Sequence, residues 1–252
     1  WNPAPIAGSG QAAAAGSINF TTRQMLRTPQ FYMILMTFVF GASAGLMSIG
    51  LMKLFPMQAL QATGMSVEAA SAIAGTAMAV FFSLANGIGR IAWGAMSDSL
   101  GRKKSIIIMM TTQGIAVILF QWMASSEYLL YAAATVIGFN FGGNFALFPT
   151  MTADTFGTKH VGQNYPFIFL AYGIGGIGGP MLGGRLGDLG NFPMAFTICG
   201  VLCLAAAVII AQVKPATESQ KMSIGNSGVK PPFSSSGKPP AAPSGGRPIA
   251  PA

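Results

Sequence analysis

Residues 31–52 read FYMILMTFVFGASAGLMSIGLM, an apolar stretch that contains no charged side chain. About 20 apolar residues in helical form are enough to cross the hydrocarbon core of a bilayer. Similar stretches follow at short intervals, near residues 69–97, 105–123, 128–153, 163–184 and 193–213. Together they predict an all-α membrane protein with six transmembrane helices.

The composition favours the same class. Charged residues make up 8% of the chain and hydrophobic residues 52%, whereas soluble domains carry about 25% charged residues. A net charge of +8 would suit a nucleic-acid-binding protein, but the basic residues lie mainly between and after the apolar stretches. We therefore expect the lipid bilayer, and no nucleic acid, as a partner.

Two polar segments flank the six-helix region, which we place at residues 25–213. Residues 1–24 are rich in Gly, Ala, Pro and Ser and read as a cytoplasmic linker at the start of a fragment. Residues 214–252 hold few large apolar side chains, so burial cannot offset the entropy of ordering them. We expect this second segment to be a disordered cytoplasmic tail.

Basic residues also predict the orientation in the membrane. Lys and Arg concentrate in the segments that share one side with both chain ends, whereas the opposite loops hold only Lys53 and Arg185. Cytoplasmic loops of membrane proteins are enriched in these residues. We therefore expect a multi-pass protein of the cell (inner) membrane, with both ends of the fragment in the cytoplasm.

A glycine-rich and basic motif lies at the end of the second stretch, where residues 94–104 read GAMSDSLGRKK. Glycines permit a tight turn between helices, a carboxylate can meet a helix N-terminus, and cations hold a loop at the cytoplasmic surface. The motif resembles the G-x-x-x-D-x-x-G-R-K/R-K loop of the major facilitator superfamily. The matching residues, for which this implies a conformational role, are Gly94, Asp98, Gly101, Arg102, Lys103 and Lys104.

This resemblance covers about residues 20–213 and is closest to the oxalate/formate antiporter family, which is related to the monocarboxylate transporters. It is carried further by residues 26–31 (LRTPQF), 86–94 (NGIGRIAWG) and 146–149 (ALFP). In the superfamily this loop lies between helices 2 and 3 and, in weaker form, between helices 8 and 9, because the two halves repeat. The six stretches then match helices 7 to 12, the C-terminal half. The resemblance thus implies a missing N-terminal six-helix half and a monomeric carrier that works by alternating access.

Arg90 is the only charged residue well inside any of the six stretches. A charge at the centre of a transmembrane helix costs about 2.5–3.5 kcal/mol, so a compensating role is expected. A guanidinium can bind a carboxylate through two parallel hydrogen bonds, and the oxalate/formate resemblance implies substrate binding by this arginine. The alternative is that its side chain snorkels toward water or forms a structural ion pair.

Other polar side chains recur at helical spacing. Asn86 lies one turn before the arginine and can orient either the guanidinium or the anion. Asn140 and Asn144 share a face of the fourth stretch, and Tyr165 and Tyr172 recur on the fifth. Because polar faces of transmembrane helices point into the bundle, we expect all five to contribute to the substrate site. Interhelical hydrogen bonding or packing is the alternative for each.

The resemblance also bears on the substrate. The oxalate exchanger of the family has a lysine on helix 11 where this sequence has Tyr172. One buried positive charge suits a monocarboxylate such as lactate, pyruvate or formate better than oxalate. Transport of a monocarboxylate is therefore the main expectation, and an oxalate/formate-type dicarboxylate antiporter is the alternative. A non-transporting membrane scaffold or sensor is the alternative from another class.

The sequence does not favour an enzyme. It contains no Ser/His/Asp set, no His or Cys cluster with metal-ligand spacing and no paired carboxylates within the apolar stretches. Cys199 and Cys203 lie four residues apart in the last stretch and are expected to be apolar filler. We therefore expect neither a cofactor nor a bound metal.

Overall fold

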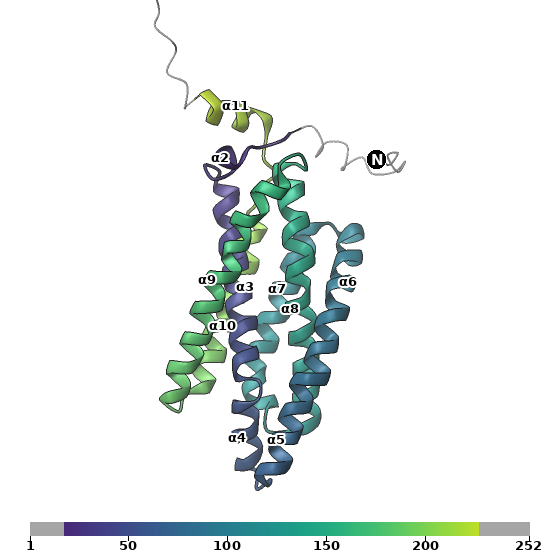
Figure 1. Ribbon diagram of the computed structural model, residues 1–252, viewed down its shortest axis with the longest axis vertical. Coiled ribbons are helices and arrows are strands. Elements are labelled where there is room, and N and C mark those ends of the chain that lie inside the picture. Colours follow the sequence, from purple (N-terminus) through teal and green to yellow (C-terminus); the bar gives the residue numbers. More distant parts are fainter. Residues whose placement is uncertain (1–17, 227–252) are drawn as a thin grey trace, which may run out of the picture.

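A computed structural model describes residues 18–226 of the chain, which form a bundle of long helices (Figure 1). The long helices are α3 (Pro29–Leu51), the continuous α5–η1–α6 (Val67–Thr76, Ala77–Phe82 and Ser83–Leu100), α7 (Arg102–Met123), α8 (Glu127–Phe156), α9 (Val161–Asp188) and α10 (Phe192–Ala211). These are six helices long and apolar enough to cross a membrane. The predicted all-α fold with six membrane-length helices is confirmed.

Three shorter helices complete the described chain. They are α2 (Thr22–Met25), α4 (Leu54–Ala62) and α11 (Glu218–Asn226). The first and last of these lie together at one end of the bundle, and α4 lies at the opposite end beside α5 (Figure 1).

Local sequence explains where the long helices begin and turn. The Thr28 hydroxyl accepts a hydrogen bond from the Phe31 backbone N–H at 3.3 Å, and Pro29 occupies the first turn of α3. This combination is favourable at a helix N-terminus. Between α6 and α7, Gly101 adopts a φ of 86°, a conformation that favours glycine. The chain can therefore reverse direction there without a loop.

Glycines allow the long helices to pack closely in pairs, α3 with α9, α6 with α8 and α7 with α10. A Cβ at Gly175 of α9 would lie 2.8 Å from the Ala42 Cβ and the Ser43 nitrogen of α3. A Cβ at Gly114 of α7 would lie 2.7 Å from the Gly200 carbonyl oxygen of α10. Small residues of this kind let helix backbones approach each other in membranes.

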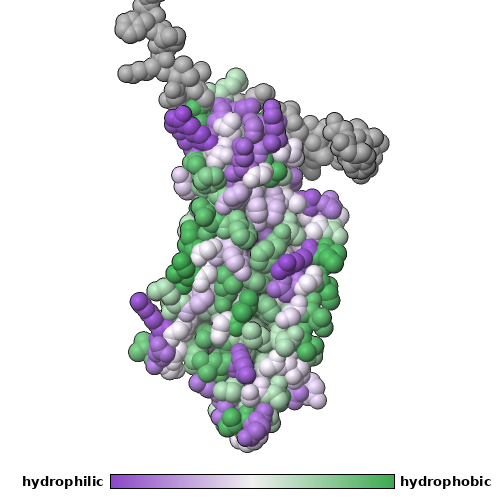
Figure 2. Space-filling view, viewed as in Figure 1, coloured by the Kyte–Doolittle hydropathy of each residue, from purple (hydrophilic) through white to green (hydrophobic). Residues whose placement is uncertain are grey.

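Hydrophobic side chains dominate the middle of the visible surface, whereas hydrophilic side chains gather at the end that carries α2 and α11 (Figure 2). Large apolar side chains are exposed on the outer helix faces, for example Leu84, Ile91, Trp122 and Ile177. Such a belt suits the hydrocarbon core of a bilayer, with the polar end in the interfacial region.

The segment before α3 packs against the helix ends. Phe20 is fully buried, its ring centroid lies 6.0 Å from that of Phe156, and its backbone N–H donates to the Phe156 carbonyl at 2.9 Å. Residues 18–24 of the expected linker are thus ordered by contacts with the turn between α8 and α9. Residues 1–17 of that linker lie outside the described residues.

The tail prediction and the structure differ over Glu218–Asn226, which form α11. Contacts with the bundle explain the difference: Gln220 and Gln30 exchange side-chain hydrogen bonds at 3.1 and 3.2 Å, and the Val213 carbonyl accepts from Lys103 Nζ at 2.8 Å. Ala216 is buried as well. The remainder of the predicted tail, residues 227–252, lies outside the described residues.

Candidate functional site

Arg90 lies exposed on α6, on the side of the helix that meets α8. Its Nε donates a hydrogen bond to Asn86 Oδ1 at 3.3 Å, and its guanidinium carbon lies 4.5 Å from the centre of the Phe145 ring of α8. A cation over an aromatic face contributes about 0.5–1 kcal/mol at an exposed site. Within residues 18–226 the terminal nitrogens Nη1 and Nη2 make no hydrogen bond. They are therefore free to receive a ligand.

An aromatic surface continues from α8 to α9. The centroid of the Tyr172 ring lies 5.5 Å from that of Phe145 and 5.3 Å from that of Phe169. Tyr172 and Phe169 are stacked, with an interplanar angle of 8°. The ring centroids of Tyr165 and Phe169 lie 5.7 Å apart, and those of Phe141 and Tyr172 lie 6.4 Å apart. We call these five side chains the aromatic surface; Phe141 is its buried part, at 3% exposure. Of the residues that the sequence suggested, the structure places Asn86 against Arg90 and brings Tyr172 next to it through Phe145, whereas Tyr165 lies farther along the surface, beyond Phe169.

The other two candidate amides lie elsewhere. Asn140 Nδ2 donates to Thr112 Oγ1 of α7 at 3.0 Å, and Asn144 Nδ2 donates to the Phe141 carbonyl of its own helix at 3.0 Å. Each asparagine is 3% exposed, and Asn144 Oδ1 points toward Gly41 of α3. The bond to α7 favours the interhelical alternative for Asn140. Asn144 bonds only within its own helix, and among the described residues its buried Oδ1 has no hydrogen-bond partner.

Three members of the aromatic surface are missing from the sequence-based candidates. Phenylalanine is common in apolar helices, so Phe141, Phe145 and Phe169 carry no signal of their own. Their spacing offers a weak one: Phe169 lies four residues after Tyr165 and three before Tyr172, which places all three on one helical face. The pairing of Phe145 with Arg90 depends on the contact between α6 and α8.

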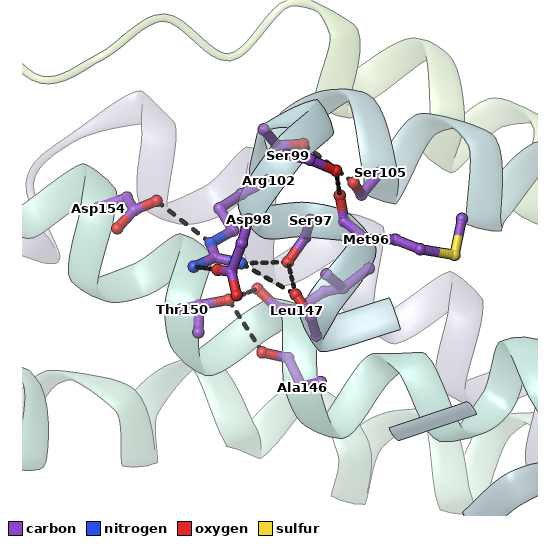
Figure 3. A network of polar contacts seen from close by, with 12 residues as sticks. Met96, Ser97, Asp98, Ser99, Arg102, Ser105, Ala146, Leu147, Thr150 and Asp154 are labelled. Atoms are coloured by element: carbon purple, nitrogen blue, oxygen red, sulfur yellow. Dashed lines mark hydrogen bonds and ion pairs between the residues drawn. The ribbon is translucent and has the colours of Figure 1, made fainter. Parts of the chain in front are cut away.

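The loop motif forms a polar network where α6 meets α7 and α8 (Figure 3). Arg102 is its centre and forms two ion pairs: Nη2 lies 2.5 Å from Asp98 Oδ1, and Nε lies 3.6 Å from Asp154 Oδ2 of α8. Its Nη1 also donates hydrogen bonds to the Gly94 carbonyl at 3.4 Å and to Ser97 Oγ. Both carboxylates are more than half exposed, at 67% and 55%. Each ion pair is therefore expected to contribute only about 0–1 kcal/mol.

The other motif residues extend this network along the end of the bundle. Gly101 makes the turn, Lys103 binds the carbonyl that follows α10, and Lys104 is exposed. Asp98 lies eight residues after Arg90 on the same helix, which is about 12 Å along the axis. The motif therefore ties α6, α7, α8 and the chain after α10 together at some distance from the arginine.

Comparison with known proteins gives a consistent family. Residues 31–243 match the Major Facilitator Superfamily. The chain is 32% identical, over 63% of its length, to the uncharacterized MFS-type transporter YhjX of Escherichia coli K12, of which it covers 38%. It is 28% identical, over 81% of its length, to the oxalate:formate antiporter of Oxalobacter formigenes, of which it covers 48%. Apicoplast pyruvate carrier 1 of Toxoplasma gondii is 32% identical over 49% of the chain, which covers 24% of that carrier.

The chain spans about half or less of the length of these curated relatives. Its six membrane-length helices and its glycine-rich basic turn agree with the family match. The expected multi-pass membrane class and the expected family are both confirmed. This chain is a multi-pass integral membrane protein with an all-α six-helix half of the fold, and it belongs to the Major Facilitator Superfamily as a relative of the oxalate:formate antiporter.

Proposed function

We propose that this chain is the C-terminal half, helices 7 to 12, of a secondary transporter that carries a small monocarboxylate by alternating access. The observation that carries the proposal is the Arg90 guanidinium held between Asn86 and the aromatic surface, with both terminal nitrogens free of hydrogen bonds to residues 18–226. Relatives named as an oxalate:formate antiporter and a pyruvate carrier support a carboxylate as the substrate. Lactate, pyruvate and formate are the candidate anions.

The partners of Arg90 define how an anion would be received. Asn86 occupies Nε and the Phe145 ring covers one face of the guanidinium, so the carboxylate binds end-on to Nη1 and Nη2. Two parallel charge-assisted hydrogen bonds then fix its orientation. The Phe145 ring excludes water from one face of the guanidinium, and closure by a second half would strengthen these bonds further by excluding it from the other.

The aromatic surface is suited to the rest of a small monocarboxylate. A methyl group would lie on Phe145, the ring next to the guanidinium, whereas a keto or hydroxyl oxygen would point toward Tyr172. Within the part of the chain that the structure describes, the hydroxyl group of Tyr172 makes no hydrogen bond, so it is available to a ligand. No second cation accompanies Arg90 among the described residues of this surface, which favours one carboxylate over two.

The exposure of the site supports a second half that closes over it. Arg90 is exposed, Phe169 is 37% exposed, and Tyr172 is half-buried. A charged and aromatic face of this kind is expected at the midplane between two repeats of a transporter, where relative motion exposes the site to each side in turn. We therefore propose that the N-terminal six-helix half supplies the opposite wall within one monomeric carrier.

The proposal includes the orientation of the chain. Basic side chains concentrate at the end of the bundle that carries α2 and α11; they are Arg23, Arg27, Arg102, Lys103, Lys104, Lys159, Lys214 and Lys221. Because cytoplasmic surfaces of membrane proteins are enriched in Lys and Arg, we place this end in the cytoplasm of a cell (inner) membrane.

Uptake by the full-length protein in proteoliposomes tests the proposal, with labelled lactate, formate and oxalate as substrates. Arg90→Lys is expected to weaken saturable monocarboxylate uptake because an ammonium cannot make the bidentate contact, and Arg90→Ala to abolish it. Arg185→Ala, at an exposed arginine near the end of α9, is the matched control and should transport normally. Unchanged uptake in folded Arg90 variants would reduce this arginine to a structural residue. If the wild type takes up none of the three anions, the substrate assignment is wrong.

A further inference from the structure

Gly142 of α8 lies directly against Asn86 of α6. A Cβ at position 142 would overlap the main-chain carbonyl oxygen of Asn86 and lie 3.1 Å from its Oδ1. The same Oδ1 accepts the hydrogen bond from Arg90 Nε at 3.3 Å. Phe145, which packs on the guanidinium at 4.5 Å, follows Gly142 by three residues on the same helix. Asn86 and Phe145 thus contact the guanidinium directly, and Gly142 contacts it only through Asn86.

We propose that Gly142 is a positioning residue for the anion-binding arginine. Because it has no side chain, α6 approaches α8 closely enough for Asn86 and Phe145 to hold the guanidinium from two directions. The inference rests on the proposed function of Arg90 and adds a residue that contacts neither the arginine nor the substrate. Its effect on anion binding is transmitted through Asn86 and through the distance between the two helices.

Neighbouring contacts show why the helix distance depends on glycine. A Cβ at Gly138 would overlap the Phe82 carbonyl oxygen, and a Cβ at Gly89 of α6 would overlap the Phe139 carbonyl oxygen. These partners are backbone atoms within helices, so they cannot rotate away as the end of a long side chain can. A methyl group on either side of this contact must move one helix. Any such movement separates the guanidinium on α6 from the aromatic surface on α8 and α9.

Chemical modification measures the position of the arginine without reference to transport. Phenylglyoxal reacts with the terminal nitrogens of a guanidinium, and its rate at Arg90 is followed by mass spectrometry on the full-length reconstituted protein. We expect Gly142→Ala to accelerate modification at least threefold, because the ring no longer shields one face of the group. Gly87→Ala is the matched control: it lies on α6 beside Asn86, and a Cβ there meets no atom of the described residues within 4 Å. An unchanged rate in a folded Gly142→Ala protein would overturn the inference.

Anion affinity provides the second measurement. We expect Gly142→Ala to raise the KM for the transported monocarboxylate about tenfold, comparable to the loss of one charge-assisted hydrogen bond. In an Arg90→Lys background the same change should add little, since the two substitutions act through one interaction. Additive effects in this double-mutant cycle would assign Gly142 a general structural role. If Gly142→Ala accumulates poorly, Gly89→Ala crowds the same helix pair from the other side and must give the same pattern.

The two proposals fail differently. Faster modification in Gly142→Ala, together with Arg90 variants that transport normally, would leave the positioning role intact and refute anion binding by the arginine. Loss of uptake in Arg90→Ala, together with unchanged modification and unchanged KM in Gly142→Ala, would support anion binding and refute the positioning role.

Discussion

Replacing Asn164 with alanine tests how the segment before α3 is held against the bundle. Asn164 lies near the start of α9 and is fully buried. Its Nδ2 donates to the Phe20 carbonyl at 3.0 Å, and its Oδ1 accepts from Thr22 Oγ1 at 2.9 Å. Asn164→Ala removes both partners at once. The Phe20 carbonyl, on a residue that is itself fully buried, then loses the amide that binds it.

The structure sets the expected magnitude. A buried polar group left unpaired costs about 1–3 kcal/mol, whereas the half-buried Thr22 can turn its hydroxyl toward water at smaller cost. We expect the free energy of local opening of residues 18–25 to fall by about 2 kcal/mol, which corresponds to roughly 30-fold faster amide exchange. The bonds from the Phe20 N–H to Phe156 and from the Lys159 N–H to Asn19 remain, so the segment should loosen and not detach.

Hydrogen–deuterium exchange of the full-length protein, resolved on peptides that cover residues 18–28, measures this change directly. Gln163→Ala is the control, because Gln163 is the preceding residue of α9 and is exposed. Equal exchange in the two variants, or a change below about threefold in Asn164→Ala, would show that the amide does not hold the segment.

Three further predictions concern the helix contacts and the site. Asn140→Leu should lower the free energy of unfolding by about 0.5–2 kcal/mol, because it removes one interhelical hydrogen bond to Thr112 of α7. The KM should stay unchanged; a raised KM with normal stability would place Asn140 at the substrate. Tyr172→Lys should increase uptake of oxalate relative to formate, since a second cation would meet a second carboxylate, and an unchanged ratio would contradict this. Gly175→Leu should prevent accumulation of folded protein by separating α9 from α3, whereas Gly173→Leu, on the open side of α9, should be tolerated. Equal accumulation of the two variants would show that folding does not depend on this close contact between α9 and α3.

The sequence by itself determined the membrane class and the number of long helices. Stretches of about 20 apolar residues have no stable alternative to helices in a bilayer, because each backbone polar group must be paired within the segment. Arg90 was also identifiable, since a charge inside an apolar stretch costs free energy and needs a reason. The loop motif at residues 94–104 pointed to the family, and its glycine at the turn has the φ that such a turn requires.

Only the tertiary structure decided which way each helix faces. In a membrane both the lipid side and the core side of a helix are apolar, so periodicity leaves its rotation about the axis open. The rotation of α8 buries Asn140 and Asn144 and turns Phe145 toward Arg90. That rotation follows from close backbone contacts such as the one between Gly142 and α6, which join residues far apart in the sequence. Residue types therefore supplied the guanidinium, and helix packing supplied the aromatic surface beside it.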